Sequence, residues 1–145
     1  MKNNIKLYTL KKLQSKFPQT ILTGSQSASD FIKQFYTDDI EIFESAFLLL
    51  LNNSNKTIGY AKISQGGISG TVIDVRLVAK YAIESLATGV ILAHNHPSGK
   101  LKPSNSDKTV TEKIKNGLAI LDITLLDHLI ITKEGFYSFS DEHIL

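Results

Sequence analysis

The sequence contains no cysteine, and this absence excludes two kinds of structure. Without a thiol, the chain can form neither a disulfide framework nor a thiolate metal site. Any metal ion that the protein holds must therefore be bound by imidazole and carboxylate side chains.

Long apolar runs are also missing. The longest extends from Ala46 to Leu51, far short of the roughly 18 residues that a membrane-spanning helix needs. Residues 1–10 mix lysines with isolated apolar side chains and lack the apolar core of a secretory signal. The absence of both features favours a cytoplasmic protein with no membrane partner.

A strong excess of charge of one sign is missing as well. The net charge of +2 does not by itself imply nucleic acid or an anionic membrane as a partner. The 145 residues are 42% hydrophobic and 21% charged, as in an ordinary globular protein. A chain of this length fits one domain that buries roughly two-thirds of its unfolded surface.

The pattern of apolar residues predicts a mixed α/β (α+β) fold, with a central mixed β-sheet flanked by helices. A weak alternation predicts an edge strand over residues 5–10, and a capping box at Ser27–Asp30 predicts a helix that carries Phe31, Ile32, Phe35 and Tyr36. The further elements expected are strands at 47–51, 57–63, 89–93, 123–131 and 136–139, and helices at 75–87 and 106–121. We expect residues 1–38 to form a short accessory segment and residues 39–145 to form the domain.

The most informative residues are two histidines and an aspartate. His94 and His96 stand in an i, i+2 relation at the end of a predicted strand, which places both imidazoles on the same side. Pro97 biases His96 toward an extended conformation. Asp107 follows after a loop long enough to turn back and add a carboxylate. Two histidines and one aspartate leave the fourth position of a tetrahedral zinc ion open for water, as in catalytic sites.

These residues carry a resemblance. Glu44, the His94-x-His96-Pro97 segment and the Ser104-x-x-Asp107 segment resemble the JAMM motif of the JAB/MPN metalloprotease superfamily. The segments 91–99 and 125–128 narrow the resemblance to the RadC family, historically described as DNA repair proteins. It covers about residues 39–145 and implies a RadC-like JAB domain with the cytidine-deaminase-like JAB/MPN architecture.

The resemblance implies a zinc-dependent hydrolase, specifically a metallopeptidase or isopeptidase with one zinc ion per chain. In the superfamily the two histidines and the aspartate, here His94, His96 and Asp107, bind the zinc ion. The glutamate, here Glu44, is the general base for the zinc-bound water, and the serine, here Ser104, helps to stabilise the oxyanion. The chemistry agrees, since zinc lowers the pKa of water to about 7 and a nearby carboxylate can take the proton.

Several of these residues have plainer explanations. The histidines could face solvent without a ligand, and Ser104 with Asp107 also forms an ordinary capping box, which does not exclude metal binding. Glu41 lies near Glu44, and local chemistry does not separate the two; Glu44 is preferred because of its spacing from the following strand.

Other polar residues are assigned to the surface or to element ends. Asp127 and His128 could orient a metal ligand from outside the site, but the beginning of a strand is the favoured explanation. Asp74 and Arg76 fit a helix cap and a surface cation. The lysines that surround the predicted site are most simply a solvated helix face, because no aromatic residues are interleaved with them to stack bases: Lys100, Lys102, Lys108, Lys113 and Lys115.

Two alternative functions stay open at this point. The family's history and the local lysines suggest a nucleic-acid module in repair or mobile-element biology, with or without catalysis. The usual N-terminal helix-hairpin-helix region does not fit into residues 1–40, which weakens this alternative. A non-catalytic scaffold is disfavoured because all five motif positions are filled. A protein or peptide substrate is therefore the expected partner.

Overall fold

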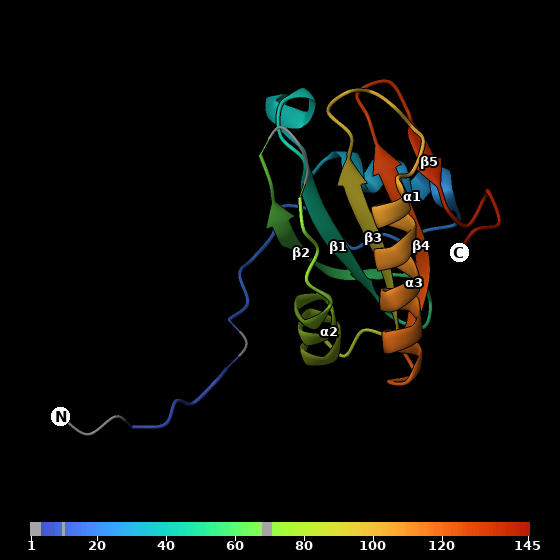
Figure 1. Cartoon of the computed structure of the whole chain (residues 1–145). Helices are drawn as coiled ribbons and strands as arrows, with labels where there is room; N and C mark the ends of the chain where they lie inside the picture. The colour runs from blue at the N-terminus through green and yellow to red at the C-terminus, as the bar shows by residue number, and fades with distance from the viewer. Residues whose placement is uncertain (1–3, 10, 68–70) are drawn as a thin grey trace.

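The computed structural model describes residues 4–9, 11–67 and 71–145, and a five-stranded sheet forms its centre (Figure 1). The elements in chain order are α1 (Ser25–Lys33), the 3-10 helix η1 (Asp38–Glu41), β1 (Ser45–Leu51), β2 (Thr57–Gln65), α2 (Val75–Glu84), β3 (Gly89–Asn95), α3 (Asn105–Ala119), β4 (Thr124–Ile131) and β5 (Phe136–Ser138).

The sheet contains both parallel and antiparallel pairs, in the order β2-β1-β3-β4-β5. β1 is antiparallel to β2 and to β3, β3 is parallel to β4, and β5 is antiparallel to β4. Parallel pairing needs a long crossover, which α3 supplies between β3 and β4. The mixed sheet with flanking helices confirms the predicted fold class.

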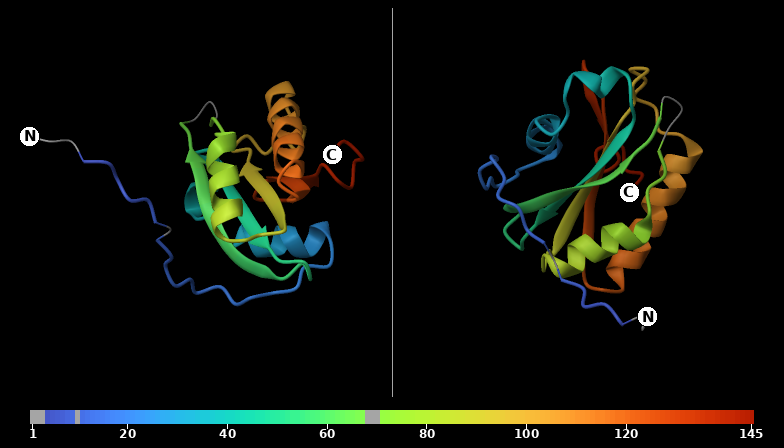
Figure 2. Two further views of the ribbon diagram at one scale, coloured as in Figure 1. Left: turned by 90° about the horizontal axis from the view of Figure 1, so that it is seen from below. Right: turned by 90° about the vertical axis from the view of Figure 1, so that its left-hand side faces the viewer.

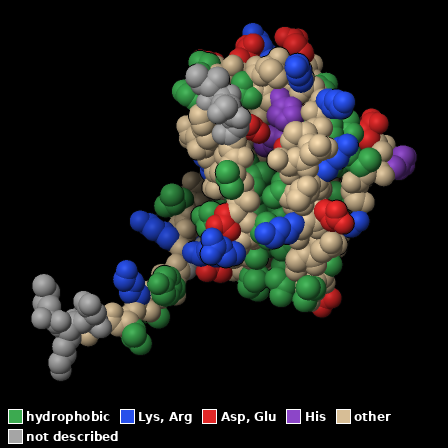
Figure 3. Space-filling view, viewed as in Figure 1, with side chains coloured by type: hydrophobic (Ala, Val, Ile, Leu, Met, Phe, Trp, Pro, Cys, Tyr) green, Lys and Arg blue, Asp and Glu red, His purple; other side chains and the backbone are tan. Residues whose placement is uncertain are grey.

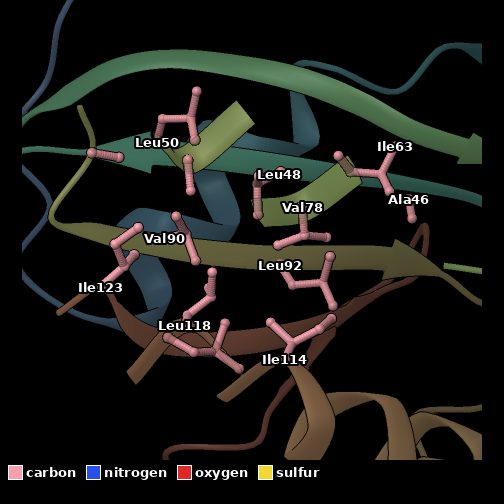
Figure 4. Packing of buried hydrophobic residues seen from close by; sticks show 13 residues of the cluster. Ala46, Leu48, Leu50, Ile63, Val78, Val90, Leu92, Ile114, Leu118 and Ile123 are labelled. Carbon is pink, nitrogen blue, oxygen red and sulfur yellow. The ribbon is translucent and has the colours of Figure 1, made fainter. Parts of the chain in front are cut away.

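Both faces of the central strands are covered by helices. Leu48 and Leu92 point to the face that α2 and α3 cover, where they pack in one buried cluster with Ile114 (Figure 4). Leu49 points to the opposite face and shares a second cluster with Ile32 of α1. Figure 2 shows the sheet between α1 on one side and α2 with α3 on the other. This double burial explains why β1 and β3 are continuous apolar runs.

The predicted strands and helices after residue 40 are confirmed, with ends that shift by a few residues. The strand predicted to end at Ala93 continues to Asn95. The longest described helix, α3, has 15 residues. Across the described residues, no helix combines the length and the apolar character that a membrane crossing requires.

The first helix begins earlier than the capping-box prediction placed it. α1 starts at Ser25, so Ser27 lies in its first turn rather than before it. The Ser27 hydroxyl accepts hydrogen bonds from the N–H groups of Thr23 and Gly24, at 2.9 and 3.1 Å. Ser27 therefore satisfies backbone donors at the start of the helix from inside the helix.

The predicted edge strand over residues 5–10 is wrong for the residues that are described. Residues 4–9 form no strand, and Ile5 and Leu7 are 100% and 91% exposed. In Figure 1 this part of the chain extends away from the sheet. Weak alternation does not make a strand without a neighbour to pair with. Leu10, the last residue of this predicted strand, lies outside the described residues.

Candidate metal centre

His94 and His96 meet at the end of β3. His94 lies within the strand, and His96 follows it, held by a hydrogen bond of 3.0 Å from its N–H to the carbonyl of Ile131. Their Nε2 atoms are 2.9 Å apart. The i, i+2 spacing thus brings both rings to one point, as the period of a strand predicts.

The loop after β3 orients the ring of His96. The Nδ1–H of His96 donates to the carbonyl of Lys100 at 2.7 Å, because a carbonyl oxygen can only accept. The turn that brings Lys100 back is closed by a hydrogen bond of 3.0 Å from the Gly99 N–H to the His96 carbonyl. Gly99 has φ of 82°, a left-handed conformation that favours glycine. With Nδ1 engaged, Nε2 of His96 is free to bind a cation.

Asp107 enters the site from the first turn of α3. Ser104 is the N-cap of this helix: its hydroxyl accepts from the Asp107 N–H at 3.0 Å, and its own N–H donates to Asp107 Oδ2 at 2.8 Å. This reciprocal capping box fixes the carboxylate while Oδ1 lies 3.3 Å from His94 Nε2. The cap and the contact with the histidines therefore coexist in one side chain.

Glu44 comes from the residue before β1, and its Oε1 lies 3.7 Å from His94 Nε2. Its carbonyl accepts from the Gly66 N–H at 2.8 Å, so the end of β2 holds it in place. Glu41, the alternative candidate, lies in η1 and pairs with Lys133 at 3.2 Å instead. The structure brings Glu44 and not Glu41 into the cluster.

The four side chains form a candidate metal-binding group. One ligand atom from each of Glu44, His94, His96 and Asp107 lies within 4.8 Å of the others. Ligand atoms of a tetrahedral zinc ion are about 3.3 Å apart. Asp107 Oδ1 lies 3.3 Å from His94 Nε2 and Asp107 Oδ2 lies 3.4 Å from His96 Nε2, near that spacing, while the two Nε2 atoms are closer together at 2.9 Å. The donor set of two imidazoles and a carboxylate fits zinc as well, so these residues are able to hold such an ion.

The cluster opens to solvent on one side. The His94 side chain is 1% exposed, whereas His96 is 16% exposed and Glu44 and Asp107 are each 15% exposed. Figure 3 shows histidine side chains at the surface, with charged side chains of both signs nearby. A pocket of about 100 Å³ adjoins His96, and Thr132 and Lys133 form part of its wall. His96, Glu44 and Asp107 are therefore in contact with solvent, whereas His94 is not.

Burial and mutual contacts shift the pKa values of the cluster. Burial raises the pKa of Glu44 above its ordinary value, with the histidines opposing the rise. Burial also acts to raise the pKa of Asp107, but hydrogen bonds with His94 and His96 outweigh it and lower the pKa. The contact with Asp107 raises the pKa of His96. The cluster thus contains one strongly anionic carboxylate and one carboxylate with increased basicity.

Asn95, between the two histidines, has a role that the sequence analysis missed. Its side chain points to the opposite face of the sheet, where Oδ1 accepts from the Ser45 N–H at 2.7 Å. Its Nδ2 donates to the carbonyls of Ile40 and Phe43, at 2.6 and 2.8 Å. Asn95 therefore ties the segment that carries Glu44 to the strand that carries the histidines. The available signal was a polar residue inside an apolar strand, since buried polar groups need partners.

His128 was assigned to the beginning of a strand, and that interpretation is wrong. It lies within β4, fully buried, and its Nε2 is 2.8 Å from His94 Nδ1. Its Nδ1 is 2.6 Å from Oγ1 of Thr111 in α3, a residue that the sequence analysis did not single out. The neighbouring Asp127 points the other way and accepts from Ser138 Oγ at 2.6 Å.

The remaining polar residues lie outside the cluster. Asp74 caps α2 by accepting from the Arg76 N–H at 2.9 Å, and the two side chains form an exposed ion pair. The lysines singled out near the site are all exposed.

The sheet, the α3 crossover and the histidine–carboxylate cluster agree with a JAB domain. Residues 22–144 match the family described as the RadC-like JAB domain, and the chain belongs to this family.

Several curated bacterial relatives are similar to this chain. A UPF0758 protein of Flavobacterium johnsoniae is 58% identical over 101 residues, which cover 70% of this chain and 44% of that protein. A UPF0758 protein of Porphyromonas gingivalis is 42% identical over 86% of this chain and 54% of its own length. The UPF0758 protein YfjY of Escherichia coli is 39% identical over 85% of this chain and 76% of its own length. The chain thus spans about half the length of the first two relatives.

Proposed function

We propose that the chain is a zinc-dependent hydrolase that cleaves an amide bond in a peptide, protein or isopeptide substrate. His94, His96 and Asp107 are the proposed ligands of one zinc ion. The observation that carries the proposal is the convergence of two Nε2 atoms and two carboxylates at a solvent-accessible end of the sheet. The membership in a JAB-domain family supports it.

The donor set suits catalysis better than a purely structural site. Three protein ligands leave one tetrahedral position open, whereas structural zinc sites fill all four. A zinc ion in such a site lowers the pKa of water toward neutrality and polarises a carbonyl oxygen. Other divalent metals also accept two imidazoles and a carboxylate as ligands. The identity of the bound metal is therefore determined by measuring the metal content of the protein.

Glu44 is the proposed general base. Its half-buried carboxylate has a raised pKa, which makes it a better proton acceptor near neutral pH than an exposed glutamate. It takes a proton from the attacking water and passes the proton to the leaving amine nitrogen. Ser104 is the proposed donor to the oxyanion: its oxygen accepts from the Asp107 N–H, so its hydroxyl proton remains available.

Metal content measured by mass spectrometry tests the metal site directly. Wild type should contain about one zinc ion per chain, since three ligands converge, and His96→Ala should contain none. The proposal fails if the wild type holds no stoichiometric metal even after zinc is added. A folded His96→Ala variant that keeps its zinc would exclude His96 as a ligand.

A pair of glutamate variants tests the catalytic step. Glu44→Gln should keep its zinc and lose hydrolysis of peptide and isopeptide test substrates. Glu41→Gln is the matched control, because Glu41 is close in sequence but pairs with Lys133; it should keep both properties. Equal loss in the two variants would contradict the assignment of Glu44.

The alternative function as a nucleic-acid module stays a prediction. A DNA affinity that falls steeply as the salt concentration rises would support it.

A further inference from the structure

His128 is a buried imidazole that the proposed chemistry does not use. It has no solvent exposure, and the Phe139 ring stacks on it with the ring centroids 4.6 Å apart. Both of its nitrogens are engaged, one with Thr111 and the other with His94. His128 thus connects α3 to the back of the candidate metal centre.

The hydroxyl of Thr111 determines where the protons lie in the series of hydrogen bonds from Thr111 through His128 to His94. Its Oγ1 lies 2.5 Å from the carbonyl oxygen of Asp107, and a carbonyl oxygen can only accept. The single hydroxyl proton is therefore used there. Toward His128 the hydroxyl oxygen must accept, so Nδ1 of His128 carries a proton.

The second nitrogen of His128 determines the state of His94. The ring of His128 is fully buried, and its hydrogen-bond partners are Thr111 and His94 rather than a carboxylate, so the uncharged form is favoured. With its proton on Nδ1, its Nε2 is bare and accepts from Nδ1–H of His94 at 2.8 Å. With its Nδ1 donating to His128, the neutral tautomer of His94 is the one that leaves Nε2 bare on the side of Glu44 and Asp107.

We propose that Thr111 and His128 are positioning residues that fix the tautomer of His94 and keep its Nε2 free for a metal ion. His96 needs no such device, because its Nδ1–H donates to a backbone carbonyl that no side-chain substitution removes. The tautomer is a property of the metal-free chain, whereas its effect on metal affinity rests on the proposed function.

A pair of threonine variants tests the proposal on metal-free protein. In Thr111→Val the Nδ1–H of His128 loses its acceptor, and a buried donor without a partner is costly. His128 should then move its proton to Nε2 and donate to His94, which inverts the tautomer of His94. Thr109→Val is the matched control: Thr109 is on the same helix and donates to the carbonyl four residues earlier, but it is exposed and is not a neighbour of His128.

Long-range proton–nitrogen NMR spectra of the imidazoles, recorded above neutral pH, distinguish protonated from bare ring nitrogens. Wild type and Thr109→Val should show His94 with its proton on Nδ1, and Thr111→Val should show it on Nε2 or a mixture. Zinc affinity should fall about 10- to 100-fold in Thr111→Val alone, as for other residues that orient metal ligands. A proton on Nε2 of His94 in the wild type, or a folded Thr111→Val that matches the control, would overturn the proposal.

Variants of His128 separate tautomer control from simple packing. The Oε1 atom of Gln can reach the place of the imidazole Nε2 and accept from His94, whereas Leu offers no acceptor. His128→Gln should therefore keep more zinc affinity than His128→Leu at equal thermal stability. Equal affinities in the two variants would contradict the role. If the wild type bound zinc without hydrolysing anything, the proposed function would fail and the tautomer result would still stand.

Discussion

At the scale of single residues, Asn95 uses every polar atom of its side chain to hold the segment before β1. Asn95→Ala leaves one backbone N–H and two backbone carbonyls without these partners, so unfolding should become easier by about 2–4 kcal/mol. The proposed hydrolysis, in which Glu44 is the base, should fall much more than zinc affinity, because no proposed ligand is changed. Urea denaturation and a zinc titration measure the two effects.

Asn52→Ala provides the control for Asn95. Asn52 Oδ1 accepts from the N–H groups of Ser54 and Lys56 in the turn between β1 and β2, at 2.9 and 3.1 Å. Its loss should affect stability but not the candidate metal centre. A hydrolysis rate that falls equally in both variants would show that Asn95 acts through general stability only.

Ser104 has two roles that a pair of substitutions can separate. Ser104→Ala removes the N-cap of α3 and should cost about 1 kcal/mol of stability. Ser104→Asn keeps a good cap but lacks the hydroxyl, so stability should be retained while turnover falls about 10²- to 10³-fold. Thermal unfolding and initial rates distinguish the roles. Unchanged turnover in Ser104→Asn would show that Ser104 acts only as the N-cap of α3.

At the scale of elements, the apolar runs of β1 and β3 were predictable because both sheet faces are covered. Four motif residues were predictable because they lie close together in the sequence: His94, His96, Ser104 and Asp107. Glu44 lies far from them in the sequence and was predicted through the family resemblance. The contact between His128 and His94 was not predictable from the sequence. It depends on the parallel register of β3 and β4, in which Leu92 pairs with His128. Local periodicity carries no information on such register or on how α3 docks.

A substitution in α1 can test the prediction that residues 1–38 form an accessory segment separate from the domain. Ile32 has no solvent exposure and packs in the cluster on the second face of the sheet. If α1 is an integral part of the domain, Ile32→Ala should cost about 2–5 kcal/mol of unfolding free energy. The control Ile5→Ala, at a fully exposed position, should change stability by less than about 0.5 kcal/mol. An equally small effect of Ile32→Ala would favour a separate accessory segment.

At the scale of the whole molecule, a zinc ion held by His94, His96 and Asp107 would join the end of β3 to the start of α3. Zinc at about 1,000 times its Kd should add about 4 kcal/mol to the unfolding free energy. For a chain of this length that corresponds to a rise in Tm of about 10 °C. Differential scanning calorimetry with and without zinc measures the shift, and His96→Ala should show none.

The rise in Tm that zinc produces should also become larger as the pH increases. The pKa of His96 in the metal-free chain is raised by Asp107, so this pair stabilises the fold below about pH 6.5 and loses its effect as pH rises through the folded pKa. Zinc requires the deprotonated ring, so its contribution follows the opposite trend. The difference in Tm between zinc-loaded and zinc-free protein should therefore be larger at pH 8 than at about pH 6. A constant difference would mean that no proton is displaced.

The parallel pairing of β3 with β4 has a consequence for how the chain folds. The hairpin of β1 and β2 closes a short loop and can form early, whereas β3 and β4 pair only after the whole of α3 has been placed between them. The side chains of the candidate centre come from the segment before β1, from the end of β3 and from the start of α3, so they meet only after β1 has paired with β3 and α3 has packed on the sheet. A partly folded or partly synthesised chain therefore lacks the assembled cluster, and any hydrolytic activity would emerge only once the sheet is complete.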